Sequence, residues 1–167
     1  LLFGLIIMNS LLFYLANSMV LSIITGVISL GFFIFFTYFF RIPNRIVIAD
    51  ENYIVAPADG KIVVIEPTME NEFLKEKRLQ VSIFMSVFDV HANWFPIAGK
   101  VKHVSHQNGR YMAAYLPKSS TENERSTILI ETKCKKTILV RQIAGALARR
   151  IVTYAKEGQD CNINEQL

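Results

Sequence analysis

Residues 1–40 read LLFGLIIMNSLLFYLANSMVLSIITGVISLGFFIFFTYFF, and none of them is Lys, Arg, Asp, Glu or His. The 18 basic and 14 acidic residues of the 167-residue chain therefore all lie in the remaining 127 positions, where they make up about 25%, as in ordinary globular domains. This step in composition excludes a purely soluble protein, a disordered chain and a transporter with many membrane spans. It predicts a hydrophobic membrane anchor over residues 1–40 and a separate domain over residues 41–167.

The second half of the uncharged stretch is long enough to cross a bilayer. As a helix, residues 19–40 would be about 33 Å long, and the hydrocarbon core of a bilayer is about 30 Å thick. Residues 1–15 form a shorter apolar run, and Ala16-Asn17-Ser18 is a turn sequence between the two. A cleaved signal peptide would have a shorter apolar core. We therefore expect one or two transmembrane helices, arranged as a hairpin whose first helix is truncated at the N-terminus.

The charges that follow the anchor bear on orientation and partners. Arg41 and Arg45 come directly after the apolar run, which favours the cytoplasmic side of a membrane. The net charge of +4 is not gathered into a stripe of basic and aromatic residues, so we expect no nucleic-acid partner. The positive excess suits either contact with anionic lipid headgroups or plain solvation. Cys134 and Cys161 stand alone, without the spacing of metal ligands.

Short runs rich in β-branched residues dominate the domain after the anchor. Each is bounded by Gly, Pro, Asn or charged turn residues, which is the usual punctuation of strands. The strands that this pattern predicts cover residues 53–56, 61–65, 79–85, 100–104, 127–131 and 137–140. Residues 141–155 are ambiguous, because Ile143, Leu147 and Ile151 suit a helix while Gly145 interrupts it. We favour two strands with a break near Gly145-Ala146, and a mainly β barrel or sandwich.

Three clusters could carry chemistry. Asp59 stands in the turn APADG at residues 56–60, where it is either a turn former or a carboxylate that orients a histidine. Residues 84–96 place Ser, Asp, His, Asn and Trp at the end of an apolar strand, where His91 is either a satisfied strand-end residue or part of a site. The loop at residues 118–125 either binds an anion or is solvated. The chain contains no Gly-rich phosphate loop, GxSxG elbow or HExxH motif.

Taken in order, five segments resemble the phosphatidylserine decarboxylase family in its short, membrane-anchored prokaryotic form. Each alone is a weak match, but five in the order of the family make a chance match improbable. The segments are FFRIPNR at 39–45, VAPADGK at 55–61, FMSVFDVHAN at 84–93, KSSTENER at 118–125 and QIAGALARRIV at 142–152.

The resemblance implies a fold, a reaction and a set of site residues. The family decarboxylates phosphatidylserine to phosphatidylethanolamine with a pyruvoyl group, which it makes from a serine of its own chain during self-cleavage. Asp59 would orient the active-site histidine, and His91 would act in self-processing or handle the substrate carboxylate and proton. Substrate contacts would come from Lys118, Asn123, Arg125 and Trp94, and no metal is implied. Trp94 and Ile42 depart from the residues usual in the family.

The family's processing site is a Gly-Ser pair, and residues 1–167 contain none, since the last serine is Ser126. We therefore expect the pyruvoyl-forming serine beyond Leu167, so that this chain is most of the larger subunit and is inactive alone. Its partners would be membrane phosphatidylserine and the smaller pyruvoyl-bearing subunit, at the cytoplasmic face of the inner membrane; a homo-oligomer is left open. Residues 156–167 are similar to the hammerhead turn of biotinyl and lipoyl domains, which predicts a barrel-sandwich β domain.

Two other functions compete with this interpretation. The first is a membrane-anchored carrier or adaptor with a lipoyl-like domain and no catalysis, which requires a modifiable lysine in a tight hairpin. The second is a membrane-tethered Ser/Lys peptidase with Ser86 or Ser119 as nucleophile, for which Lys118 beside Ser119 is only a sequence neighbour.

Overall fold

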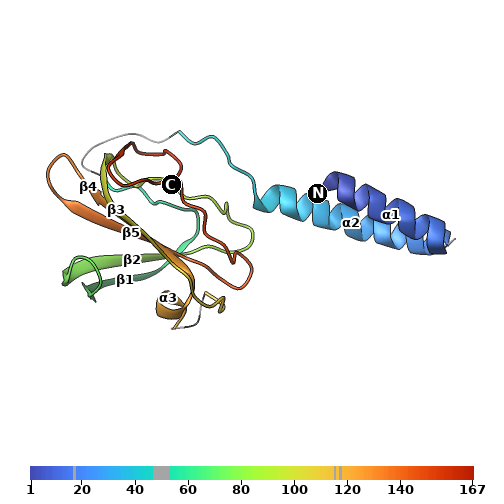
Figure 1. The fold of residues 1–167 in the computed structure, drawn as a ribbon, viewed down its shortest axis with the longest axis horizontal. Coiled ribbons are helices and arrows are strands. Elements are labelled where there is room, and N and C mark those ends of the chain that lie inside the picture. Colours follow the sequence, from blue (N-terminus) through green and yellow to red (C-terminus); the bar gives the residue numbers. More distant parts are fainter. Residues whose placement is uncertain (17, 47–52, 115, 117) are drawn as a thin grey trace. The chain divides into compact units, whose positions relative to one another are not determined.

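The computed structural model describes residues 1–167 except residues 17, 47–52, 115 and 117. The chain forms two compact units, residues 1–41 and residues 42–167. The first unit consists of two helices, α1 (Leu2–Ala16) and α2 (Met19–Phe39). The second unit contains all the strands of the described residues (Figure 1).

The two helices of the first unit pair side by side through a polar contact. Asn9 on α1 donates its Nδ2 to the Ser29 hydroxyl of α2 at 2.8 Å and to the carbonyl of Leu5 at 2.8 Å. Ser18 begins α2 as its N-cap residue, with a hydroxyl that accepts from the backbone N–H of Leu21. Most of the large apolar side chains of the pair are exposed, which suits a lipid environment. Among the described residues, α2 is long and apolar enough to span a membrane, whereas the apolar part of α1 is shorter.

The second unit contains two antiparallel sheets. Its strands are β1 (Lys61–Glu70), β2 (Glu76–Phe84), β3 (Gly99–Gln107), β4 (Arg125–Glu131), β5 (Thr137–Ile143) and β6 (Asp160–Cys161). One short helix, α3 (Ser119–Glu122), precedes β4. β1 and β2 form a two-stranded hairpin with a bulge between Ile62 and Val64. The other sheet is curled and has the strand order β5-β4-β3-β6 (Figure 1).

The core of this unit lies against β3 and β4, where Val101, Ile128 and Ile130 are fully buried. Two segments from elsewhere in the chain close it: Phe95 comes from the loop before β3, and Leu167 comes from the C-terminal segment. Burial of such side chains stabilises the fold by about 1.5–3 kcal/mol each. The core therefore holds residues 93–101 and 159–167 side by side, and these two segments frame the site described below.

The mainly β prediction is confirmed, and two of the expected strands are absent. Among the described residues, 53–56 form no ladder, because Val55 donates its N–H to the carbonyl of Pro96 and Pro57 then ends the run. Residues 151–154 form no strand either: the N–H of Ile151 donates to the Glu124 carboxylate instead of to a neighbouring strand. The first half of the ambiguous region, up to Ile143, does continue β5.

Candidate active site

The turn that carries Asp59 packs closely against the end of β2. Gly60 has a φ of +144°, which side chains rarely adopt, and a Cβ atom there would overlap the carbonyl of Phe84. Lys61 pairs with Phe84 in the hairpin register. Because residues 85–96 start directly after Phe84, the Asp59 turn and the segment that contains His91 leave the hairpin at the same end.

Arg45 joins Asp59 to Trp94. Its guanidinium forms an ion pair with the Asp59 carboxylate, and its Cζ lies 4.4 Å from the centre of the Trp94 ring. The main-chain carbonyl of Arg45 accepts from Asn164 Nδ2 at 3.0 Å, which ties the segment to the C-terminal residues. The hydrogen bond to Asp59 raises the pKa of Arg45 above its ordinary value, against a smaller opposing effect of burial. Arg45 therefore stays charged and holds the Asp59 turn beside Trp94.

His91 follows a tight turn closed by Ser86 and Asp89. Asp89 donates its N–H to the carbonyl of Ser86 at 3.0 Å, and its carboxylate accepts the N–H of Ser86 at 2.7 Å. His91 Nδ1 lies 3.0 Å from the carbonyl oxygen of Asp89. Because a carbonyl only accepts, this contact requires a proton on Nδ1, so the lone pair of the neutral ring is on Nε2. The half-buried imidazole is thus oriented by the main chain of its own turn.

Three distant parts of the chain meet at Asn93. Its carbonyl accepts the N–H of Leu167 at 2.9 Å, and its side-chain oxygen accepts from Gln142 Nε2 at 2.7 Å. The next residue, Trp94, donates its N–H to the carbonyl of Pro57 at 2.9 Å and bridges antiparallel to Gln166. The C-terminal residues therefore run antiparallel to this segment and bring Leu167 to a position two residues from His91.

Asn123 and Glu124 are each 1% exposed and act as buried polar anchors. The Asn123 amide accepts the N–H of Met112 at 3.0 Å and donates to the carbonyls of Met112 and Ala144 at 2.8 and 2.7 Å. The Glu124 carboxylate accepts the N–H of Ile151 at 3.1 Å and pairs with Arg150 at 3.2 Å. A buried amide and a buried carboxylate are stable only with such partners, so these two residues fix the loop before α3 and the loop after β5.

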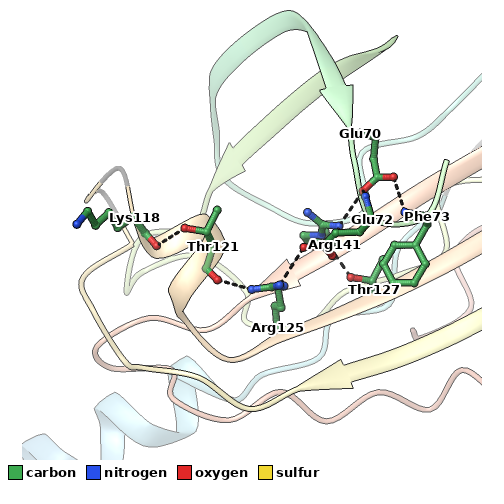
Figure 2. A network of polar contacts seen from close by, with 8 residues as sticks. All are labelled: Glu70, Glu72, Phe73, Lys118, Thr121, Arg125, Thr127 and Arg141. Carbon is green, nitrogen blue, oxygen red and sulfur yellow. Dashed lines mark hydrogen bonds and ion pairs between the residues drawn. The ribbon is translucent and has the colours of Figure 1, made fainter. Parts of the chain in front are cut away.

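Arg125 and Arg141 clamp the tip of the hairpin onto the larger sheet (Figure 2). Arg125 on β4 pairs with Glu72 at 2.9 Å, and its guanidinium also donates to the carbonyl of Thr121. Arg141 on β5 pairs with both Glu70 and Glu72, at 3.2 and 2.9 Å. The two arginines therefore share one acidic turn, which fixes how the two-stranded hairpin sits on β4 and β5.

The structure brings some of the expected site residues together. Asp59 and Trp94 meet through Arg45, and His91 lies three residues before Trp94 on the same segment. Asn123 reaches the carbonyl of Ala144, two residues beyond the Gln142 that binds Asn93. Two expected substrate residues lie apart from these contacts: Lys118 is exposed before α3, and Arg125 binds the hairpin turn.

Arg45, Glu124 and Gln142 hold positions in this region that their place in the sequence does not predict. A cationic partner such as Arg45 could have been expected from the sequence, because the carboxylate of Asp59 follows the apolar residues 53–58 and a carboxylate in apolar surroundings requires a cation nearby. Gln142 and Glu124 gave no such signal, since polar residues next to strands are most often solvated and their burial depends on contacts across the fold.

Comparison with known proteins agrees with the motifs. The family model of phosphatidylserine decarboxylase matches residues 32–167. A phosphatidylserine decarboxylase proenzyme of Parabacteroides distasonis is 56% identical over 164 residues, which cover 98% of this chain and 74% of the relative. The proenzymes of Porphyromonas gingivalis and Bacteroides thetaiotaomicron are 54% and 49% identical, over 93% and 98% of this chain and 72% of each relative. The chain therefore belongs to the phosphatidylserine decarboxylase family.

Proposed function

We propose that this chain is the larger part of a proenzyme that decarboxylates phosphatidylserine to phosphatidylethanolamine in phospholipid synthesis. Membership of a family whose relatives are named phosphatidylserine decarboxylase proenzymes carries the reaction. The relatives do not favour the alternatives of a non-catalytic carrier domain or a Ser/Lys peptidase. The geometric observation that supports a site at His91 is the hydrogen bond from the N–H of Leu167 to the carbonyl of Asn93, two residues from His91.

The pyruvoyl group implied by the family fits this place. We propose that it forms from a serine beyond Leu167, and the antiparallel course of residues 165–167 along residues 93–95 supports this, because a continued chain would pass Ala92 and His91. A buried polar atom also faces this region: among the described residues, Gln142 Oε1 has no hydrogen-bond partner, while Nε2 of the same amide binds Asn93. When bound, the group supplies a carbonyl that accepts the electron pair left by departing carbon dioxide.

The role of His91 is to hold and move a proton. Its Nδ1 contact with the carbonyl of Asp89 supports Nε2 as the basic atom of the neutral ring, the atom that would take up or give a proton in self-processing or in decarboxylation. We retain Asp59 as the carboxylate that assists His91. A carboxylate accepts several hydrogen bonds, so the ion pair with Arg45 is compatible with a further contact to the imidazole.

The phospholipid head group requires cationic and polar contacts. Lys118 is the best-supported of the four proposed substrate residues, because its ammonium is exposed and can meet a phosphate. Arg125 and Asn123 are engaged inside the fold, so their proposed contribution is to position the loop that carries Lys118. Trp94 is 7% exposed and covered by Arg45, which supports a role in shaping the floor of the site.

The proposed location is the inner membrane, with the second unit on the cytoplasmic face. The apolar helix α2 could anchor the chain in a membrane. The arginines Arg41 and Arg45, which follow that helix, support the cytoplasmic face by the positive-inside rule.

Replacing the histidine in the full-length protein tests the proposed function. We expect His91→Ala to reduce self-cleavage, decarboxylation or both by at least about 100-fold, the usual contribution of a general acid or base. Intact mass reports cleavage, and conversion of phosphatidylserine in mixed micelles reports decarboxylation. The matched control is His103→Ala, because His103 pairs with Glu157 on the surface of the domain.

Two results would contradict the proposal. A wild-type full-length protein that neither self-cleaves nor converts phosphatidylserine would remove the assigned reaction. A His91→Ala protein that cleaves and decarboxylates like the His103→Ala control would remove His91 from the site.

A further inference from the structure

One face of the β1–β2 hairpin is apolar and exposed. Side chains alternate along a strand, and the register pairs Ile65 with Val81 and Pro67 with Leu79, so these residues share a face. Five large side chains of this face are between 46% and 68% exposed. We call this surface the apolar hairpin face; its apolar residues are Ile62, Ile65, Pro67, Met69, Leu79, Val81 and Ile83, and Lys77, which pairs with Met69, shares it near the turn.

The opposite face of the same hairpin is polar, and it is the face that contacts the larger sheet. Glu70 binds Arg141 of β5 at 3.2 Å, and in the turn beyond it Phe73 lies with its ring centre 5.1 Å from that of His103 on β3. The polar residues Glu66, Thr68, Gln80 and Ser82 alternate with the apolar set. The hairpin thus turns its polar face to the larger sheet and its apolar face away from it. An exposed apolar face of this kind is typical of a surface that another polypeptide or a lipid covers.

The charges of the hairpin argue against a lipid surface as the cover. Residues 61–84 hold four acidic and four basic residues, a net charge of zero, so anionic headgroups would not attract this face. A two-stranded hairpin is at best marginally stable in water, so a cover made of further strands or a packed segment would add stability. These features favour a polypeptide as the partner.

We propose that the apolar hairpin face is the docking surface of the pyruvoyl-bearing subunit, an inference that rests on the proposed function. The relatives are named proenzymes, and this chain matches only about three quarters of their length. The remaining quarter is the polypeptide that we propose as the partner of this face. In a proenzyme that segment is covalently attached, so its effective concentration is of the order of millimolar, far above that of a second copy.

The position of the face agrees with this partner. β1 begins directly after the Asp59 turn, and β2 ends directly before the segment of His91. The end of the apolar hairpin face at Ile62 and Ile83 is therefore next to the candidate active site in the chain. A subunit docked there would be held next to the place where its own reactive group is needed. The face would therefore keep the two products of self-cleavage together after the peptide bond is broken.

Site-specific photo-crosslinking in the full-length protein tests the proposal. A benzophenone amino acid is placed at Leu79 on the apolar hairpin face and, as the matched control, at the neighbouring Gln80 on the polar face. After self-cleavage and irradiation, we expect a Leu79 cross-link whose mass is the sum of the large and small subunits. We expect at least a 10-fold lower yield of this product from position 80.

A second pair of variants guards against a local disturbance by the bulky probe. In Leu79→Asp we expect the fraction of small subunit that co-elutes with the large subunit in mild detergent to fall at least 10-fold. In Gln80→Asp, which adds the same charge to the other face, we expect co-elution to remain as in the wild type.

The outcomes separate this inference from the proposed function. If the wild type self-cleaves and converts phosphatidylserine, but position 79 cross-links to a second large subunit or to lipid, only the docking surface is overturned. The same holds if Leu79→Asp and Gln80→Asp retain the small subunit equally. If the wild type does not self-cleave, the proposed function fails and no small subunit exists to dock.

Discussion

At the scale of single residues, the fold depends on side chains that satisfy several backbone groups at once. Glu70 is the clearest case, because its carboxylate accepts the N–H groups of Glu72, Phe73 and Leu74 at 3.2, 2.8 and 2.7 Å. Arg141 adds an ion pair to the same carboxylate. One residue thus closes the hairpin turn and holds it against the larger sheet.

The pH dependence of stability follows from this carboxylate. Burial is the largest single effect and raises the pKa of Glu70, but the three N–H donors and the charge of Arg141 together outweigh it, so the pKa lies below its ordinary value. The stability that Glu70 contributes is therefore fully present above its unfolded pKa and is lost as the pH falls through its folded pKa.

We expect Glu70→Gln to lower the free energy of unfolding by about 1–3 kcal/mol at pH 7, the usual range for hydrogen bonds to a charged group. Because the wild type loses this contribution in acid, the two proteins should converge as the pH falls well below 4.5. Urea unfolding of the two full-length proteins across this pH range measures the effect. A difference that stays constant with pH would contradict the role assigned to the charge.

At the scale of the elements, the candidate site depends on how closely the turn of residues 57–60 approaches β2. Gly60 permits this approach because its backbone is in a region that L-residues rarely adopt and because Phe84 leaves no room for a Cβ atom. The ion pair between Arg45 and Asp59 depends on the same turn. A shift of the turn would therefore move Asp59 and the start of the His91 segment together.

We expect Gly60→Ala to destabilise the full-length protein by about 1–3 kcal/mol through backbone strain, and to slow self-cleavage. The matched control is Gly145→Ala. A Cβ atom added at Gly145 would lie 3.7 Å from its nearest neighbour, the Cβ atom of Ala114, which is an ordinary van der Waals contact. Urea unfolding and intact mass report the two effects. Equal stability of the two variants would show that the close approach at Gly60 is unimportant.

At the scale of the whole molecule, an apolar helical unit precedes a β unit in one chain. The apolar helix α2 could anchor the chain in a membrane, and under the proposed location this would hold the β unit at the surface in which the phospholipid substrate resides. The two cysteines offer a natural probe of its side of the membrane, because Cys134 is exposed and Cys161 is buried. Burial also raises the pKa of the Cys161 thiol, which makes it less reactive still.

We expect an impermeant maleimide to leave Cys134 unlabelled in intact spheroplasts and to label it once the inner membrane is permeabilised. The reason is the proposed cytoplasmic location of the β unit. In the matched control, Cys134→Ser, the permeabilised sample should no longer be labelled, because Cys161 is buried. Labelling of Cys134 in intact spheroplasts would place the β unit on the opposite face.

Much of the architecture is readable from local patterns. The absence of charge over residues 1–40 indicates the apolar helices. Alternation with turn residues predicts strands at residues 61–65, 79–85, 100–104, 127–131 and 137–140, which overlap five of the six strands of the described residues, β1 to β5. These signals are local because a strand or a helix presents its own periodicity. The runs at residues 53–56 and 151–154 show the limit, since their composition suits strands but no neighbouring strand pairs with them.

The sequence by itself determined the two-part composition, the mainly β class and, through its motifs, the family; it also pointed to Asp59 and His91. Only the tertiary structure decided that Arg45 pairs with Asp59, that Asn123 and Glu124 are buried anchors, and that the hairpin exposes its apolar face. The physical reason is that pairing and burial depend on which distant segments meet. Leu167 and Asn93 lie 74 positions apart in the chain and are joined by one hydrogen bond.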